Sequence, residues 1–337
     1  MKTNTLRNHT LDVIKLIASF LVVFIHVPFY GVAGEIVKLF SRVAVPVFFM
    51  TSGYFGYNND SKTIIRKIKK LAGILIFTSC LYNFTNIFTD FISDGVNGIA
   101  DYFLRFAEFD GWLNLVLFNL PFSATRLWFL FSLIYVYIVQ LLFNKLGLTY
   151  KTIFILSVCG IIIHLLLGSV MPYFGVDVPD YFCRNFLLFG YPFFGLGLIL
   201  RHREETIVKT NLSVLIVCTL LGCVLSLVPL LYNPVSQFSV GTLFLLYVVF
   251  TFALEKADTS YPKWVLILCK CSLGIYIFHR PVTMVLRKSL SVIDILDSTI
   301  LDGILLPPLV CICTAILVLI LLTLNEKNKI KKLKKAK

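Results

Sequence analysis

Three ionisable side chains in the first hydrophobic segment, residues 11–29, could support acid–base chemistry inside a membrane. They are Asp12, Lys15 and His26. Each is costly in hydrocarbon unless it meets a partner or a polar cavity. Lys15 and His26 are 11 residues apart, which in a helix returns to within about 20° of the same face, about 16 Å farther along the axis. Asp12, Lys15, Ser19 and His26 therefore form one polar stripe.

His26 lies deep within this segment, where a merely structural role is the less favoured interpretation. Because histidine accepts and returns protons near neutral pH, we predict a chemical role for it. Asp12 has two interpretations of equal weight. It either serves the same site, or it forms an ion pair with Lys15 at the membrane surface that has no chemical role.

A second histidine ends the polar face of a later segment, which reads "CSLGIYIFHRPV". Ser272, Tyr276 and His279 stand at i, i+4 and i+7, so they share one face of a helix. The predicted topology places His26 and His279 on the same, outer side of the membrane. Two histidines from different helices are therefore expected to converge on one layer. The other histidines, at positions 9, 164 and 202, are expected to be structural or interfacial.

Two or three arginines are expected in that layer. Arg42 lies near the outer end of the second hydrophobic segment, which a short loop joins to His26, and Arg126 opens the fourth. A guanidinium can stabilise an oxyanion or bind a carboxylate, a phosphate or a sugar. The alternative for Arg126 is that it only extends its charged end to the membrane surface. Trp128, two residues further on, could belong to an interfacial aromatic belt.

The whole chain has the composition of a polytopic α-helical membrane protein, which sets the elements that position these residues. Its 337 residues are 58% hydrophobic and only 15% charged, with a mean hydropathy of +0.87. Apolar runs near the length of a membrane span recur throughout. The ten predicted spans are approximately 11–29, 37–57, 71–90, 126–144, 152–171, 182–200, 211–231, 237–254, 264–284 and 299–323.

The basic residues follow this topology. With ten spans and a cytoplasmic N-terminus, 21 of the 31 Lys and Arg residues fall on the cytoplasmic side, as the positive-inside rule requires. The net charge of +13 therefore needs no nucleic-acid partner, and both termini are predicted to be cytoplasmic. Residues 1–324 are expected to form one membrane domain. Residues 325–337 are expected to form a basic tail against anionic lipid headgroups.

No metal site or permanently bound cofactor is predicted, because none of the nine cysteines has a CxxC or a Cys/His metal-ligand spacing. The first segment lacks a small-residue cleavage site and is interpreted as an uncleaved span. Residues 91–125 interleave aromatic and charged residues, which is typical of an interfacial helix or a re-entrant loop.

Four motifs resemble those of the acyltransferase-3 family of membrane acyltransferases. They are "LDVIKLIASFLVVFIH", "RVAVPVFFMTSGYF", "RLWFLFSLIY" and "SLGIYIFH", in this order, and the resemblance extends from residue 11 to about residue 320. It implies about ten transmembrane helices in a bacterial-type cytoplasmic membrane. It also implies transfer of an acyl group, often acetyl from cytoplasmic acetyl-CoA, to a hydroxyl of an extracytoplasmic or lipid-linked glycan.

The resemblance also suggests roles for the residues. The family's basic residue and histidine in the first helix match Lys15 and His26, so Lys15 is expected to help hold the CoA end, or a partner acid beside it. His26 is expected to act as general base or to carry the acyl group transiently. The remaining catalytic candidates are Arg42 and His279. The remaining substrate-binding candidates are Asp12, Arg126, Trp128, Tyr276 and Ser272.

Two departures keep a second function open. The family's basic residue is commonly Arg, whereas Lys15 keeps the charge without the bidentate geometry. The stretch after Trp128, "FLFSLIYVY", also lacks the glutamates that many O-antigen acetylases carry there. This branch is similar to the membrane domain of the vancomycin-resistance serine racemases. The alternative function is therefore transport of a small polar solute such as serine.

Overall fold

The computed structural model describes residues 8–104, 115, 127–176, 178–232, 238–291, 299 and 301–335. Within these residues all regular elements are helical, which confirms the predicted all-α class. The chain divides into two compact units. The first comprises Met1–Ala44, Thr210–Leu230 and Gly241–Lys337, and the second comprises Val45–Lys209 and Leu231–Val240.

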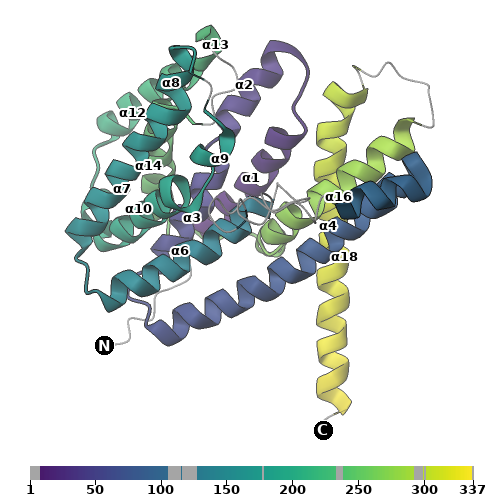
Figure 1. Cartoon of the computed structure of the whole chain (residues 1–337). Coiled ribbons are helices and arrows are strands. Elements are labelled where there is room, and N and C mark those ends of the chain that lie inside the picture. The colour runs from purple at the N-terminus through teal and green to yellow at the C-terminus, as the bar shows by residue number, and fades with distance from the viewer. Residues whose placement is uncertain are drawn as a thin grey trace. The chain divides into compact units, whose positions relative to one another are not determined.

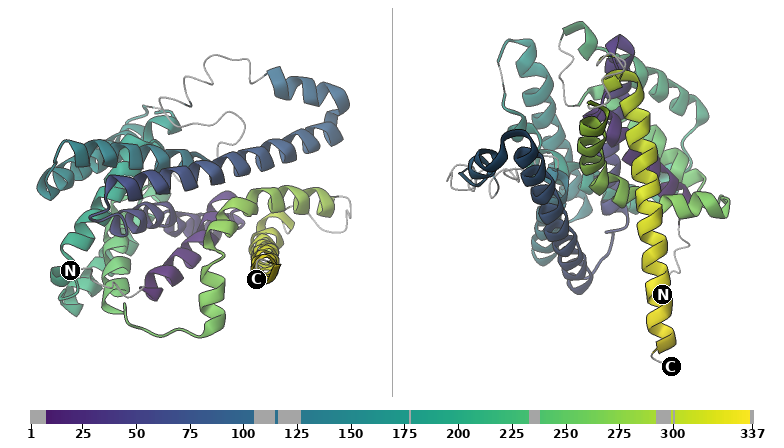
Figure 2. Two further views of the ribbon diagram at one scale, coloured as in Figure 1. Left: turned by 90° about the horizontal axis from the view of Figure 1, so that it is seen from below. Right: turned by 90° about the vertical axis from the view of Figure 1, so that its right-hand side faces the viewer.

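The first unit contains the N-terminal and C-terminal helices (Figure 1). Its elements are α1 (His9–His26), α2 (Gly31–Ser41), α12 (Leu212–Leu227), α14 (Val240–Glu255), α15 (Lys263–Cys269), α16 (Ser272–Ser291), η5 (Leu301–Leu305) and α18 (Leu306–Lys335). Helix α16 packs against both α1 and α18, and Figure 2 shows α16 beside α18. A short helix, α13 (Pro229–Tyr232), is divided between the two units.

The core of the first unit joins α1, α15–α16 and α18. Its buried side chains are aliphatic residues and cysteines, namely Leu16, Val23, Val27, Cys269, Cys271, Ile275, Leu306, Val310 and Val318. Burial of apolar area contributes about 25 cal/mol per Å² in water; between helices in lipid, close van der Waals packing replaces that term. Because Val23 and Ile275 belong to this core, it fixes the segments of α1 and α16 that carry the two histidines.

Side-chain hydrogen bonds define where α1 begins. The Asn8 side chain accepts from the backbone N–H of Leu11 at 2.9 Å and caps the helix. Its amide also donates to the carbonyl of Ala253 at 2.9 Å, and the Thr10 hydroxyl donates to the carbonyl of Lys256 at 2.5 Å. The first turn of α1 is therefore anchored to the C-terminal end of α14.

The second unit contains the remaining helices. They are α3 (Ala44–Tyr54), α4 (Ser61–Leu104), α6 (Trp128–Lys145), α7 (Tyr150–Leu165), η3 (Leu166–Val170), α8 (Met171–Tyr173), α9 (Asp180–Cys183), η4 (Phe186–Gly190), α10 (Tyr191–His202) and α11 (Glu204–Ile207). Helix α10 packs on α7, and α4 lies along α6 (Figures 1 and 2). The largest fully buried side chains of this unit include Phe49, Phe193, Phe194 and Phe238.

Each predicted span has a helical counterpart among the described residues, but not all are long single helices. Among the described residues, six helices are long and apolar enough to cross a membrane, or seven if the bent pair α15–α16 counts as one span. Two further apolar helices, Phe186–His202 and Val240–Glu255, are shorter. The molecule is thus a polytopic helical membrane protein, while the number of ten spans and the cytoplasmic termini stay predictions.

Two spans predicted as continuous are broken. The segment predicted over 37–57 is two helices, α2 and α3, separated at Arg42 and Val43. Pro46 explains this break, because in a continuous helix its ring would clash with the carbonyl four residues earlier, that of Arg42. The segment predicted over 264–284 bends by 59° between α15 and α16.

The helix that contains the third predicted span extends beyond it at both ends. Helix α4 begins at Ser61, ten residues before the predicted 71–90 span, and so includes the basic run at its first turns. It contains a non-helical residue, Gly95, with φ 61° and ψ −139°, a conformation that glycine adopts without the penalty of a Cβ. The predicted interfacial region 91–125 lies mostly outside the described residues.

Candidate active site

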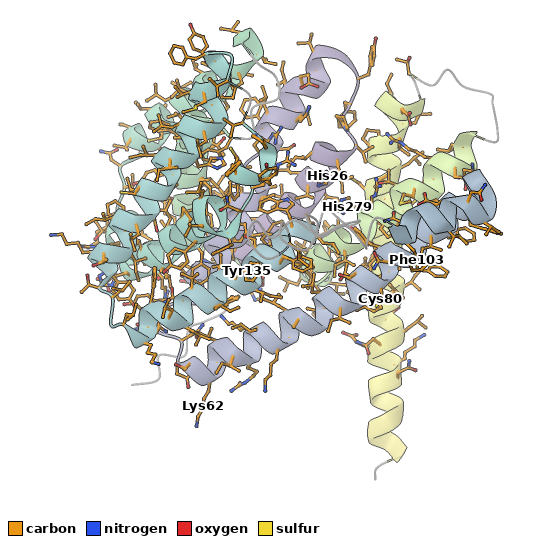
Figure 3. All side chains as sticks on the ribbon, viewed as in Figure 1. His26, Lys62, Cys80, Phe103, Tyr135 and His279 are labelled. Carbon is orange, nitrogen blue, oxygen red and sulfur yellow. The ribbon has the colours of Figure 1, made fainter. Side chains whose placement is uncertain are left out.

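The imidazole rings of His26 and His279 stack on each other. Their centroids lie 5.4 Å apart and their planes differ by 12°. His26 is the last residue of α1 and His279 lies in α16, and Figure 3 shows the two side by side. His279 is only 1% exposed, whereas His26 is half-buried. The predicted convergence of the two histidines is therefore confirmed, and His26 is the more accessible of the pair.

A backbone contact sets the protonation of His279. Its Nδ1 lies 2.7 Å from the carbonyl oxygen of Tyr276. Since a carbonyl only accepts, the proton sits on Nδ1, and Nε2 carries the lone pair when the ring is neutral. The Tyr276 ring is itself buried and tilted 46° against the His279 ring at 6.1 Å. Tyr276 thus contacts His279 through both its carbonyl and its ring.

The residues of the polar stripe on α1 have different hydrogen-bond and ion-pair partners. Asp12 is buried, and its carboxylate lies 2.7 Å from the Lys15 ammonium. The Ser19 hydroxyl is fully buried and donates to the carbonyl of Leu16 at 2.6 Å, within the same helix. Helix α1 is unbroken from His9 to His26, so its regular rise separates Lys15 from His26 by about 16 Å.

Ser272 and Arg42 both lie in the first unit, at helix ends. Ser272 begins α16 just after the bend, two turns before His279 on the same helix. Arg42 follows the last residue of α2, a helix that packs on α1, and is 9% exposed. The expected proximity of Arg42 to His26 stays a prediction.

The fourth-span candidates belong to the second unit. Trp128 is the first residue of α6 and packs against aromatic side chains. Its ring lies 5.7 Å from that of Phe189 and 6.3 Å from that of Phe49. Arg126 lies outside the described residues. The sequence placed both beside the histidines in one layer, and that placement stays a prediction.

Ion pairs account for part of the basic residues that depart from the positive-inside pattern. Besides Lys15, the ammonium of Lys38 lies 3.3 Å from Glu35. The Lys270 ammonium lies 3.5 Å from Glu326, and the Arg287 guanidinium lies 3.3 Å from Asp302. Both of these pairs are about half exposed or more, so each contributes little stability. Because Lys38, Lys270 and Arg287 already have carboxylate partners, an ion-pairing role fits them better than a catalytic one.

Sequence reasoning missed a polar and aromatic cluster in the second unit. His202, set aside as interfacial, stacks on Tyr150 at 4.5 Å, and Tyr150 stacks on Tyr57 at 5.1 Å. These residues come from α10, α7 and the turn after α3. In the sequence, each of the three lies next to a basic segment at the end of a predicted span. This shared position could have suggested that they lie on the same side of the membrane. Only the packing of α7 on α10 brings the rings together.

An all-α membrane bundle with a stacked histidine pair at one end of its first helix defines an integral membrane protein with a candidate proton-transfer site. The chain belongs to the acyltransferase-3 family, because the family model described as an acyltransferase domain matches residues 8–324. It is therefore a membrane acyltransferase. No curated protein matches the chain. No solved structure matches it either.

Proposed function

We propose that this membrane acyltransferase moves an acyl group from acyl-CoA to a hydroxyl of a glycan, and that the acyl group is acetyl. The acceptor is extracytoplasmic or lipid-linked, and the membrane is a bacterial-type cytoplasmic membrane. The observation that carries this proposal is the His26–His279 stack, in which an accessible imidazole rests on a buried one. Attack by a sugar hydroxyl requires a base that accepts its proton, and histidine supplies one near neutral pH.

His26 accepts the proton of the acceptor hydroxyl while the hydroxyl oxygen forms a bond to the thioester carbonyl carbon. The carbonyl oxygen takes the electron pair and becomes an oxyanion. When the C=O bond re-forms, the C–S bond breaks, and the CoA sulfur receives the proton that His26 had taken. A positioned general base of this kind is worth roughly 10²–10⁴ in rate.

His279 supports this role through its fixed orientation. Its Nδ1–H is held by the Tyr276 carbonyl at 2.7 Å, and its ring backs the His26 ring. Two imidazolium rings stacked at this distance would repel each other. The pair therefore accommodates one additional proton better than two, which suits a base that takes up a single proton in each cycle.

The other candidates serve charge and binding. Arg42 is assigned to the oxyanion, because a guanidinium donor stabilises charge that develops in the transition state. Lys15 and its partner Asp12 are assigned to the donor thioester, which must reach His26 along α1. Arg126 and Trp128 are assigned to binding of the acceptor sugar. Ser272 is assigned to binding of either the donor or the acceptor.

Washed membranes supplied with radiolabelled acetyl-CoA test this function. Label is expected to enter the glycan fraction with the natural protein and to fall at least a hundredfold with His26→Gln. Ile17→Leu, at an exposed position of the same helix, is the matched control and should retain transfer. Transfer that persists in His26→Gln would overturn the assigned role of His26.

A second arm addresses the transport alternative. Sealed vesicles are given labelled serine with no acyl donor. Serine accumulation that needs the protein, combined with no acetyl transfer to any glycan fraction, would contradict the proposed enzyme function. Acetyl transfer without protein-dependent serine accumulation supports it.

A further inference from the structure

Three aromatic rings from separate parts of the second unit lie together. Tyr57 lies in the turn between α3 and α4, Tyr150 is the first residue of α7, and His202 is the last residue of α10. The Tyr150 ring is stacked on His202, with planes at 19°, and on Tyr57, with planes at 25°. We call these three residues the aromatic cluster.

Hydrogen bonds hold the aromatic cluster in place. The Tyr150 hydroxyl donates to Asn58 Oδ1 at 2.7 Å, and the Tyr57 hydroxyl lies 3.1 Å from His202 Nδ1. Asn58 has a positive φ of 54°, which asparagine tolerates better than most residues. The turn that carries Tyr57 is thus fixed to α7 and α10 by side-chain contacts rather than by backbone pairing.

A partly buried ion pair adjoins the aromatic cluster. The guanidinium of Arg201 pairs with Glu204, donates to the Tyr54 hydroxyl at 2.9 Å and lies over the Tyr54 ring at 5.2 Å. The Tyr54 hydroxyl in turn donates to Glu204 at 2.8 Å. Glu204 is therefore already engaged, and its charge is balanced by Arg201.

The surrounding segments carry an excess of positive charge. Residues 55–67, 144–151 and 201–205 contain seven Lys and Arg residues and three Asp and Glu residues, an excess of four. They adjoin the cluster directly, since Lys151 follows Tyr150 and Arg203 follows His202. His202, Lys151 and Arg203 are all exposed. Exposed cations are thus the immediate sequence neighbours of two residues of the aromatic cluster.

Aromatic faces beside basic side chains are the chemistry that binds nucleotides. A purine stacks on an aromatic ring, and Lys and Arg pair with its phosphates. Lipid headgroups offer phosphate without a purine, so a ring cluster among the cations favours a nucleotide. The same three segments are those that the charge pattern assigns to the cytoplasmic side, where nucleotides are present.

We propose that the aromatic cluster and its neighbouring cations bind the nucleotide end of the acyl-CoA donor, an adenosine with 3′- and 5′-linked phosphates. This inference rests on the proposed acyl-CoA donor. Adenine stacks on the exposed face of His202, with Tyr150 behind it. Lys151 and Arg203 pair with the phosphates.

Binding of desulfo-CoA to the purified full-length protein in nanodiscs of neutral lipid tests this site. The probe lacks the sulfur, so it cannot react with the protein's cysteines. Tyr150→Leu and His202→Gln are each expected to weaken its Kd about tenfold, the effect of one lost stacking partner. Tyr173→Leu, which removes an exposed tyrosine of α8 in the same unit, should leave the Kd unchanged. Because His202 is exposed, its variant should fold even if Tyr150→Leu does not.

Two ligand arms separate a nucleotide from a lipid headgroup. Adenosine 3′,5′-bisphosphate should displace desulfo-CoA from the natural protein, and pantetheine should not. The protein in nanodiscs with one-third phosphatidylglycerol should bind desulfo-CoA with a Kd close to that measured in neutral lipid. Loss of binding in phosphatidylglycerol, or equal Kd values for the natural protein and both ring variants, would overturn the inference.

Kinetics with two donors keep this inference distinct from the proposed function. With acetyl-CoA, His202→Gln should raise KM about tenfold. With acetyl-N-acetylcysteamine, a thioester without a nucleotide, its KM should equal that of the natural protein, whereas His26→Gln should lose transfer from both donors. His26-dependent transfer with an unchanged acetyl-CoA KM in His202→Gln would sink the nucleotide site and leave the function standing. If desulfo-CoA binding depends on the rings but neither donor supports transfer, the nucleotide site stands and the proposed function is overturned.

Discussion

The His26 and His279 rings are stacked 5.4 Å apart, although one ends the first helix and the other lies in α16, far along the chain. The buried ring is oriented by its own helix, through the Tyr276 carbonyl. The accessible ring is placed by the packing of α1 on α16. The relationship therefore depends on two elements that share a core, and any change that separates them should affect both histidines together.

The two histidines are expected to act as a unit. His26→Gln and His279→Gln should each lower the acetyl-transfer rate at least a hundredfold, because each removes part of one proton-transfer arrangement. The double variant should then be close to the slower single variant, since groups that act together are not additive. Initial rates in washed membranes, corrected for the amount of protein, provide the measurement. Losses that multiply in the double variant would show two independent roles.

The Asp12–Lys15 pair is expected to stabilise α1. The Asp12 side chain is 8% exposed and that of Lys15 is 27% exposed. Lys15→Met removes the ammonium group 2.7 Å from the buried carboxylate and should cost about 1–2 kcal/mol, less than a fully buried pair. Lys15→Arg keeps the charge and should cost less. The unfolding midpoint in detergent, followed with a thiol-reactive dye, measures both.

A matched double variant provides the control for that pair. Adding Asp12→Asn to Lys15→Met removes the carboxylate charge and should recover much of the loss. If Asp12→Asn instead lowers the midpoint further in the Lys15→Met background, the pair is not the source of the stability.

Close packing of α3 on α10 is expected to tolerate no side chain at two glycines. A Cβ on Gly53 would lie 1.9 Å from the Phe194 carbonyl oxygen, and one on Gly197 would lie 2.0 Å from that of Met50. Gly53→Ala and Gly197→Ala should therefore each destabilise the protein by about 1–3 kcal/mol through overpacking. Both clashes involve backbone atoms, which cannot rotate away as a side chain can.

Gly73→Ala is the matched control for these glycines. Gly73 lies in α4, and a Cβ added there would meet no atom within 4 Å. Alanine should therefore be neutral or favourable at this position, by up to about 1 kcal/mol. Unfolding midpoints that fall equally in all three variants would contradict the role of the close helix contact.

The first turn of α4 is expected to depend on pH through Asp60. Its carboxylate accepts from the Thr63 hydroxyl and, at 3.0 Å, from the Thr63 backbone N–H, which lowers the pKa of Asp60 below its ordinary 3.8. A lowered carboxyl pKa contributes stability above the unfolded pKa and loses it as the pH falls through the folded pKa. The gap in unfolding midpoint between the natural protein and Asp60→Ala should therefore be present at pH 6 and close below about pH 4.

Asp60→Asn separates the cap from its charge. Asparagine can accept the same hydrogen bond without titrating, so its advantage over Asp60→Ala should not vary across that pH range. A gap between the natural protein and Asp60→Ala that is unchanged at low pH would rule out the charged form as its source.

The sequence by itself determined the properties that depend on neighbouring residues along the chain. Apolar runs of membrane length identify the spans, and the spacing of Lys15 and His26 fixes their shared helix face, because helical periodicity is a local property. The break before α3 was not predicted, although Pro46 explains it, since its ring would clash with the carbonyl of Arg42 in a continuous helix. The convergence of His26 and His279 also followed, through the alternation of spans across the membrane.

Only the tertiary structure decided which side chains touch. The stack of His26 on His279 depends on how α1 rotates against α16. The meeting of Tyr57, Tyr150 and His202 depends on α7 packing against α10. Apolar helices in a membrane present many similar faces to one another, and close contact between small residues, such as Gly53 and Gly197 with their neighbours, selects among them. The pairing of helices is a property of complementary shapes brought together from distant parts of the chain, so no local pattern specifies it.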